Sequence, residues 1–154
     1  MTKLLRIGIA GLGTVGGGTL KILLTQAALL EARTGRTLQV VAVSAKNKNK
    51  NRGVDMSGIR WVDDPMALAS DPEIDVVVEC IGGSEGAAKT LVEAALKNKK
   101  SVVTVNKALI AHHGVALAQL AEASGALLAF EAAVAGGIPI IKGLRDGLAA
   151  NRFT

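Results

Sequence analysis

The chain has 154 residues, which suits a single domain. Apolar residues make up 49% and aromatic residues only 2%, so aliphatic side chains must fill the core, as is typical of parallel sheets covered by helices. The single cysteine excludes an internal disulfide and favours a cytoplasmic location. The net charge of +5 fits nucleic acid or a phosphate-bearing cofactor, but the lack of stacking aromatics argues against nucleic acid. The first apolar run, residues 4–10, is too short for a membrane segment.

Strands and helices are predicted to alternate along the chain. Continuous apolar runs mark the strands, and apolar residues at helical spacing mark the helices. The predicted strands are 4–10, 38–43, 59–62, 75–81, 101–105 and 126–131; the predicted helices are 14–32, a short one from Pro65, 84–97, 114–123 and 136–150. This alternation predicts an α/β fold, with a doubly wound, mostly parallel sheet and helices on both faces.

The first strand is followed directly by a glycine motif, G-L-G-T-V-G, at residues 11–16. Between a strand and a helix, this motif is typical of Rossmann-type dinucleotide binding. Gly11 allows the tight turn, Gly13 lets the backbone approach a pyrophosphate, and Gly16 lets the helix pack closely. The helix start offers free N–H groups to phosphates. The predicted cofactor-binding residues of the motif are Gly11, Leu12, Gly13, Thr14, Val15 and Gly16.

The end of the second strand indicates which dinucleotide is preferred. Sites specific for NAD usually place a carboxylate there, to bind the ribose 2′-hydroxyl. Here the segment 44–52 is basic, and no carboxylate precedes Asp55. Lys46 is the best candidate to bind a 2′-phosphate, whereas Lys48 and Lys50 fit a solvated loop equally well. We therefore expect NADP(H) to be preferred, with NAD(H) possible.

Two glycines, Gly82 and Gly83, follow the fourth strand. They fall at the carboxyl edge of the sheet, where open α/β sheets bind ligands. We expect them to let the ribose-nicotinamide half of the cofactor approach the backbone. A plain turn between strand and helix is the alternative.

Three segments go beyond a generic dinucleotide fold: 11–16 (GLGTVG), 103–111 (VTVNKALIA) and 130–142 (FEAAVAGGIPIIK). In this order and spacing, the chain resembles the N-terminal half of homoserine dehydrogenase over almost its whole length. The resemblance implies an NAD(P)H-dependent reduction of aspartate 4-semialdehyde to homoserine, on the route to threonine, methionine and isoleucine.

The resemblance also assigns residues. Lys107 matches the family lysine at the nicotinamide end and the substrate, and a cation there would stabilise negative charge on the reacting oxygen. Glu131 and the following loop match a site for a monovalent cation such as Na⁺. Its ligands would include backbone carbonyls around Val134, Gly136 and Ile138, a donor type that suits a hard cation.

Residues 1–154 are thus expected to form one NAD(P)-binding domain, with the substrate domain following residue 154 and absent from the chain. The chain stops at residues 151–154, straight after a predicted helix. By resemblance, the missing part also carries most contacts of a homo-oligomer. This chain alone is expected to bind cofactor without completing catalysis.

Three other functions remain open at this point. One is the cofactor domain of another semialdehyde or amino-acid oxidoreductase, which the 131–142 segment disfavours. Another is a stand-alone NADP(H)-sensing module, and the third is nucleic-acid binding. His112 and His113 receive no role, and Cys80 is expected to be a small apolar side chain in a buried strand.

Overall fold

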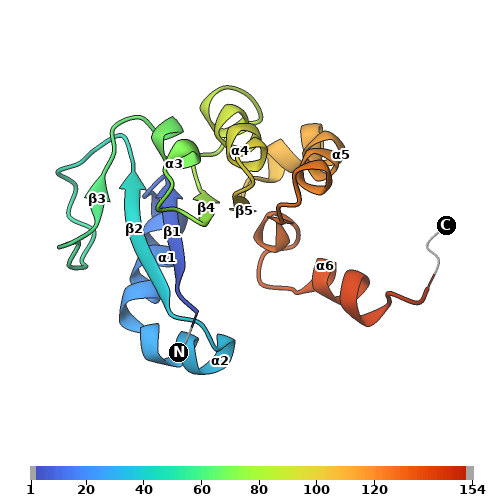
Figure 1. Ribbon diagram of the computed structural model, residues 1–154, viewed down its shortest axis with the longest axis horizontal. Helices are drawn as coiled ribbons and strands as arrows, with labels where there is room; N and C mark the ends of the chain where they lie inside the picture. Colours follow the sequence, from blue (N-terminus) through green and yellow to red (C-terminus); the bar gives the residue numbers. More distant parts are fainter. Residues whose placement is uncertain (1–2, 152–154) are drawn as a thin grey trace.

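Six parallel strands form one sheet in the order β3-β2-β1-β4-β5-β6 (Figure 1). The computed structural model describes residues 3–151. Residues 152–154, which follow the last predicted helix, lie outside the described residues. The strands are β1 (Leu5–Ala10), β2 (Leu38–Ser44), β3 (Arg60–Trp61), β4 (Val76–Glu79), β5 (Ser101–Thr104) and β6 (Leu128–Ala129). The order reverses between β1 and β4, as in the Rossmann fold. The predicted doubly wound fold is confirmed, and all pairings among the described strands are parallel.

Helices connect the strands. They are α1 (Thr14–Thr25), α2 (Ala27–Thr34), α3 (Met66–Ser70), α4 (Ala87–Lys97), α5 (Lys107–Ser124) and α6 (Ile140–Lys142), with a 3₁₀ turn η1 (Glu131–Ala133) and a π turn η2 (Gly143–Gly147). In the part of the chain that the structure describes, none of these helices has both the length and the apolar character needed to cross a membrane.

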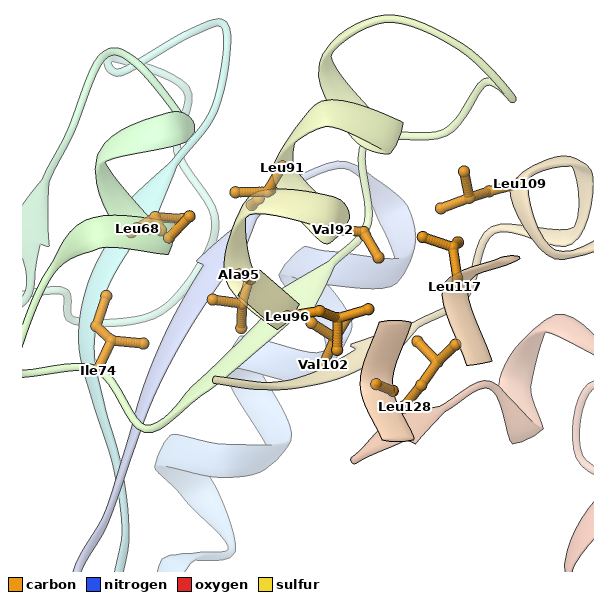
Figure 2. Packing of buried hydrophobic residues seen from close by; sticks show 14 of the residues in the cluster. Leu68, Ile74, Leu91, Val92, Ala95, Leu96, Val102, Leu109, Leu117 and Leu128 are labelled. Atoms are coloured by element: carbon orange, nitrogen blue, oxygen red, sulfur yellow. The ribbon is translucent and has the colours of Figure 1, made fainter. Parts of the chain in front are cut away.

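The sheet has a buried cluster on each face because successive strand residues point to opposite sides. Ile7 and Ile9 of β1 pack with Leu20 of α1 in one cluster. Ala10 belongs to the other, larger cluster, which the helices α3, α4 and α5 cover. Figure 2 shows this second cluster, in which labelled residues include Leu68, Leu91, Leu96, Val102 and Leu117. The two clusters fix the strands, and hence the positions of their carboxyl ends.

Three predicted helices differ from the structure. The predicted helix 14–32 is two helices that meet at Gln26, where the Thr25 hydroxyl donates to the Lys21 carbonyl, a bond that bends helices. The helix predicted from residue 114 begins at Lys107, because the Asn106 side chain caps it. The predicted helix 136–150 is reduced to α6 and η2, which have no buried residues to hold a longer helix.

Candidate dinucleotide-binding site

A cleft of about 530 Å³ opens at the carboxyl edge of the sheet, a volume typical of small-molecule sites. Its lining comes from the ends of β1, β2 and β4, on both sides of the point where the strand order reverses. Gly11 and Gly13 contribute from the first turn, Lys46 from the end of β2, and Cys80 and Ile81 from the end of β4. Of the predicted cofactor residues, the cleft brings together Gly11, Leu12, Gly13 and Lys46, whereas Thr14, Val15, Gly16, Gly82, Gly83 and Lys107 do not line it.

The glycine loop is set by sterics. Gly11 has a φ of +92°, and a Cβ there would lie 2.4 Å from the carbonyl oxygen of Cys80. A Cβ at Gly16 would lie 1.8 Å from the carbonyl oxygen of Gly11. The Gly11 N–H donates to the Ser44 carbonyl at 2.8 Å, which ties the loop to β2. No larger residue fits at either glycine unless the backbone moves.

Gly13 differs because nothing lies within 4 Å of the position that its Cβ would take. It is exposed, and as the N-cap of α1 it gives the helix no side-chain hydrogen bond. The open space and the uncapped helix start are what a phosphate needs, since the first-turn N–H groups are free to bind an anion. Among the other loop residues, Thr14 and Val15 are exposed, while Leu12 is buried in the core.

The basic loop after β2 has two kinds of cation. Lys46 and Lys50 are exposed and line the cleft, whereas Lys48 does not. Arg52 also lines the cleft, but its guanidinium bonds within the loop: it donates to the carbonyls of Asn47, at 2.6 Å, and Lys50, at 2.8 Å. It also lies 5.2 Å from the centre of the Trp61 ring, a cation–π distance. Sequence reasoning missed this organising role of Arg52 and Trp61.

One carboxylate, Asp63, also lines the cleft. It follows the short strand β3 rather than β2, and it accepts a hydrogen bond from the indole N–H of Trp61 at 3.0 Å. The residues that line the cleft at the end of β2 are Ser44, Ala45 and Lys46, so the acidic side chain of the cleft comes from the segment after β3 instead.

The second glycine turn has a different construction. Gly82 and Gly83 have φ values of +87° and +85°, yet a Cβ at Gly82 would meet nothing within 4 Å. The turn is instead held by Glu79, which is fully buried. Its Oε1 accepts hydrogen bonds from the N–H groups of Ile81, at 2.7 Å, and Gly82, at 3.1 Å.

Glu79 is linked to the start of α5. Its Oε2 accepts a hydrogen bond from the Thr104 hydroxyl at 2.5 Å. The Thr104 hydroxyl oxygen in turn accepts one from the Asn106 N–H at 3.0 Å. The Asn106 side chain accepts from the Leu109 N–H at 3.1 Å and donates to the Gly83 carbonyl at 2.7 Å. Lys107, exposed and first in α5, therefore begins a helix bonded to the Gly82-Gly83 turn.

The sequence carried two unused signals for these residues. Glu79 is an acidic residue within the apolar run 75–81, where a buried position would require hydrogen-bond partners. Asn106 is a favoured N-cap residue directly before Lys-Ala-Leu-Ile-Ala, a run with good helix formers. Cys80 lies between the two turns as a partly buried thiol. Burial, followed by the negative charge of Glu79, raises the pKa of Cys80 to about 11.

The predicted cation residues lie after β6. Glu131 begins η1, and its carboxylate accepts from the N–H groups of Ile141, at 3.1 Å, and Lys142, at 2.9 Å, at the start of α6. Val134, Gly136 and Ile138 lie between η1 and α6, and Ile138 is 62% exposed. Within residues 3–151, no group of three or more His, Cys, Asp or Glu side chains is arranged to hold a metal.

The rings of His112 and His113 lie 6.2 Å apart, and His113 also pairs with a carboxylate. The His113 ring contacts the Glu85 carboxylate at 2.5 Å, and this hydrogen bond lowers the pKa of Glu85. Glu85 also accepts from Lys89 at 3.3 Å. The His113–Glu85 pair joins α5 to the segment before α4. His113 therefore makes a polar contact between these two elements.

Residues 11–131 match the family model of the homoserine dehydrogenase NAD binding domain. The chain belongs to the homoserine dehydrogenase family. The homoserine dehydrogenase of Pseudomonas aeruginosa is 48% identical over 151 residues, which cover 98% of this chain and 34% of the relative.

Solved homoserine dehydrogenases share the fold. The crystal structure of the Thiobacillus denitrificans enzyme has a TM-score of 0.87 and 48% identity, over 97% of this chain and 34% of that chain. A hyperthermophilic archaeal homoserine dehydrogenase in complex with NADPH has a TM-score of 0.78 at 24% identity, over 96% of this chain and 50% of that chain. The chain thus contains the NAD-binding domain of the family and spans about a third of the length of its bacterial relatives.

Proposed function

We propose that the chain is the NADP(H)-binding domain of an enzyme that reduces aspartate 4-semialdehyde to homoserine. The observation that carries this proposal is the open backbone at Gly13. It lies in the same loop as Gly11 and Gly16, where a larger residue would clash with the backbone. Membership of the homoserine dehydrogenase family supplies the reaction. Since the chain spans a third of its relatives, catalysis would need a substrate domain that follows residue 154 in the full-length protein.

The preference for NADP(H) rests on the charges around the cleft. Lys46 lines it just after the end of β2, where an NAD-specific site would carry a carboxylate, and Lys50 lines it further along the same loop. We assign the 2′-phosphate to Lys46, with Lys50, which also lines the cleft, adding positive potential. An archaeal member of the family is known in complex with NADPH, which fits this assignment.

The bound cofactor would supply the hydride that reduces the aldehyde carbon. Lys107 would stabilise the negative charge that develops on the aldehyde oxygen. In support, Lys107 is the first residue of α5, and the residue before it, Asn106, donates to the Gly83 carbonyl. Gly82 and Gly83 would present bare backbone to the nicotinamide half. Gly11, Leu12, Thr14, Val15 and Gly16 would bind the pyrophosphate through the loop backbone.

Three further assignments belong to the full-length enzyme. A Na⁺ ion would bind near Glu131 and the carbonyls of Val134, Gly136 and Ile138, which follow β6 in one short segment of the chain. The enzyme would form a homo-oligomer through the part that follows residue 154. It would act in the cytoplasm, where the free Cys80 thiol and the reduced cofactor are compatible with the surroundings.

Parallel titrations of this chain with NADPH and NADH, followed by calorimetry, test the cofactor assignment. We expect NADPH to bind more tightly. Equal affinity, or tighter binding of NADH, would refute the preference, and binding of neither would refute the cofactor site. For the reaction, the full-length protein should oxidise NADPH only when aspartate 4-semialdehyde is present. Replacing NaCl with choline chloride in that assay tests the cation.

A further inference from the structure

Buried side chains join the carboxyl ends of β4 and β5, beyond the glycine loop. The connection runs from Glu79 through Thr104 to Asn106 and then to the Gly83 carbonyl, and we call it the Glu79 network. Glu79 and Thr104 are fully buried, and Asn106 is 5% exposed. The neighbouring strand residues are valines, so a carboxylate here is the exception and not the pattern.

The Glu79 carboxylate is only an acceptor in this network. Two peptide N–H groups donate to one of its oxygens, and the Thr104 hydroxyl donates to the other. Among residues 3–151, Glu79 forms no ion pair with a Lys, Arg or His. A buried carboxylate without a cation seldom adds stability over an apolar residue of similar volume. Its presence in β4 therefore calls for another reason.

The network holds the Gly82-Gly83 turn from two sides. Glu79 fixes the N–H of Gly82, and Asn106 fixes the carbonyl of Gly83. Two consecutive glycines without a steric clash at either position are otherwise the freest point of a backbone. Both glycines are exposed at the sheet edge, so the fixed turn is a surface without side chains. Such a surface suits a flat ring.

The same network sets the start of α5. Asn106 caps the helix through the Leu109 N–H, and the next residue is Lys107. Asn106 thus joins the turn and the helix through the two ends of one amide. We infer that Glu79 is a positioning residue for the nicotinamide half of the cofactor, acting through Thr104 and Asn106. This inference rests on the proposed function.

A pair of substitutions at Thr104 tests the inference in this chain. Thr104→Val keeps the shape of the side chain but leaves the Glu79 Oε2 and the Asn106 N–H without their partner, whereas Thr104→Ser keeps the hydroxyl. Each variant is titrated with NADPH and with 2′-phospho-ADP-ribose, which lacks only the nicotinamide. We expect Thr104→Val to weaken NADPH binding about tenfold and to leave the fragment within about twofold. Thr104→Ser should restore the affinity for NADPH.

A second variant covers the case in which Thr104→Val does not fold. Asn106→Asp keeps the oxygen that caps α5 but loses the donor to the Gly83 carbonyl. Asn98→Asp is its matched control, because the Asn98 amide donates to the Ala69 carbonyl at 3.0 Å, near the C-terminal end of α4. We expect Asn106→Asp to lower the ratio of the affinity for NADPH to the affinity for the fragment about fivefold. Asn98→Asp should leave this ratio unchanged.

The outcomes separate the two proposals. If the unaltered chain binds neither NADPH nor the fragment, the proposed cofactor site fails. If it binds both with equal affinity, the nicotinamide adds no binding energy at this edge of the sheet, and the positioning role is overturned. The role is also overturned if the variants weaken NADPH and the fragment to the same extent, because that result marks a purely structural effect.

Discussion

The two glycine turns at the carboxyl edge of the sheet are held in opposite ways. The turn after β1 is held by exclusion: a Cβ at Gly11 or Gly16 would overlap a backbone carbonyl. The turn after β4 has room for a Cβ at Gly82, and side chains of β4 and of the segment after β5 hold it by hydrogen bonds. One turn is a property of the local chain, and the other depends on the assembled sheet.

This difference matches the chemistry proposed for each end of the cofactor. A pyrophosphate is bound by charge and by N–H groups, so bare backbone at a helix start is sufficient. The nicotinamide end must present one carbon to a substrate in a fixed geometry, and small errors of placement cost rate. Long-range bonds from Glu79 and Asn106 provide that restraint where glycines alone would not.

The largest effect is expected when the first turn is broken. Gly16→Ala places a Cβ 1.8 Å from the Gly11 carbonyl oxygen, so the loop must move. We expect a loss of about 3 kcal/mol or more in the free energy of unfolding, measured in urea, and no detectable NADPH binding. Gly18→Ala is the control, because Gly18 is exposed in α1 with nothing within 4 Å. It should stabilise the chain by about 0.5–1 kcal/mol, and a loss there would contradict the steric account.

A smaller effect is expected at the second turn. Gly82→Ala meets no atom within 4 Å and carries only the strain of a φ near +87°. We expect a loss of about 1–2 kcal/mol in the free energy of unfolding. Gly13→Ala, at a φ of −73° with open space, should leave unfolding almost unchanged while weakening NADPH binding. If Gly82→Ala proved as damaging as Gly16→Ala, the two turns would not differ as described.

The charge at the first turn lies on the neighbouring loop. Lys46→Ala should weaken NADPH binding about tenfold and leave NADH binding unchanged, since only NADPH has the 2′-phosphate. Lys48→Ala is the matched control from the same loop, because Lys48 does not line the cleft. Equal losses from the two substitutions, measured by calorimetry, would show a diffuse field and no specific contact.

The smallest effect concerns Cys80, which lies between the turns. Burial, with the charge of Glu79, raises its pKa to about 11, so little thiolate is present at pH 8. We expect Cys80 to react with a disulfide reagent about a hundredfold more slowly than a thiol of pKa near 9. The rate should rise as the pH approaches 11. A fast reaction at pH 8 would show that the segment between the turns opens readily.

Local rules were enough to predict the first turn and the order of strands and helices. The glycine motif has a steric basis within a few residues, and the aliphatic runs of β1 and β2 are long enough to identify as buried strands. The second turn was predicted as a pair of glycines, but not what holds it. The bond between Glu79 and Thr104 spans 25 residues, so no local pattern contains it.

Helix ends show the same division. The start of α5 was predicted seven residues too late because His112, His113 and Gly114 have low helix propensity, although the cap at Asn106 outweighs them. The predicted long helix at the end of the chain was wrong because a helix of this kind needs a packed face, and residues 140–147 bury none.

The Glu79 network also has a consequence for hydrogen exchange. Four peptide N–H groups at one edge, those of Ile81, Gly82, Asn106 and Leu109, donate to side chains of Glu79, Thr104 and Asn106. Outside strand and helix ladders, such amides usually exchange fast. Here the four would exchange slowly and together, because the side chains that protect them are bonded to one another. Their common exchange rate would report how often the proposed nicotinamide end of the site opens.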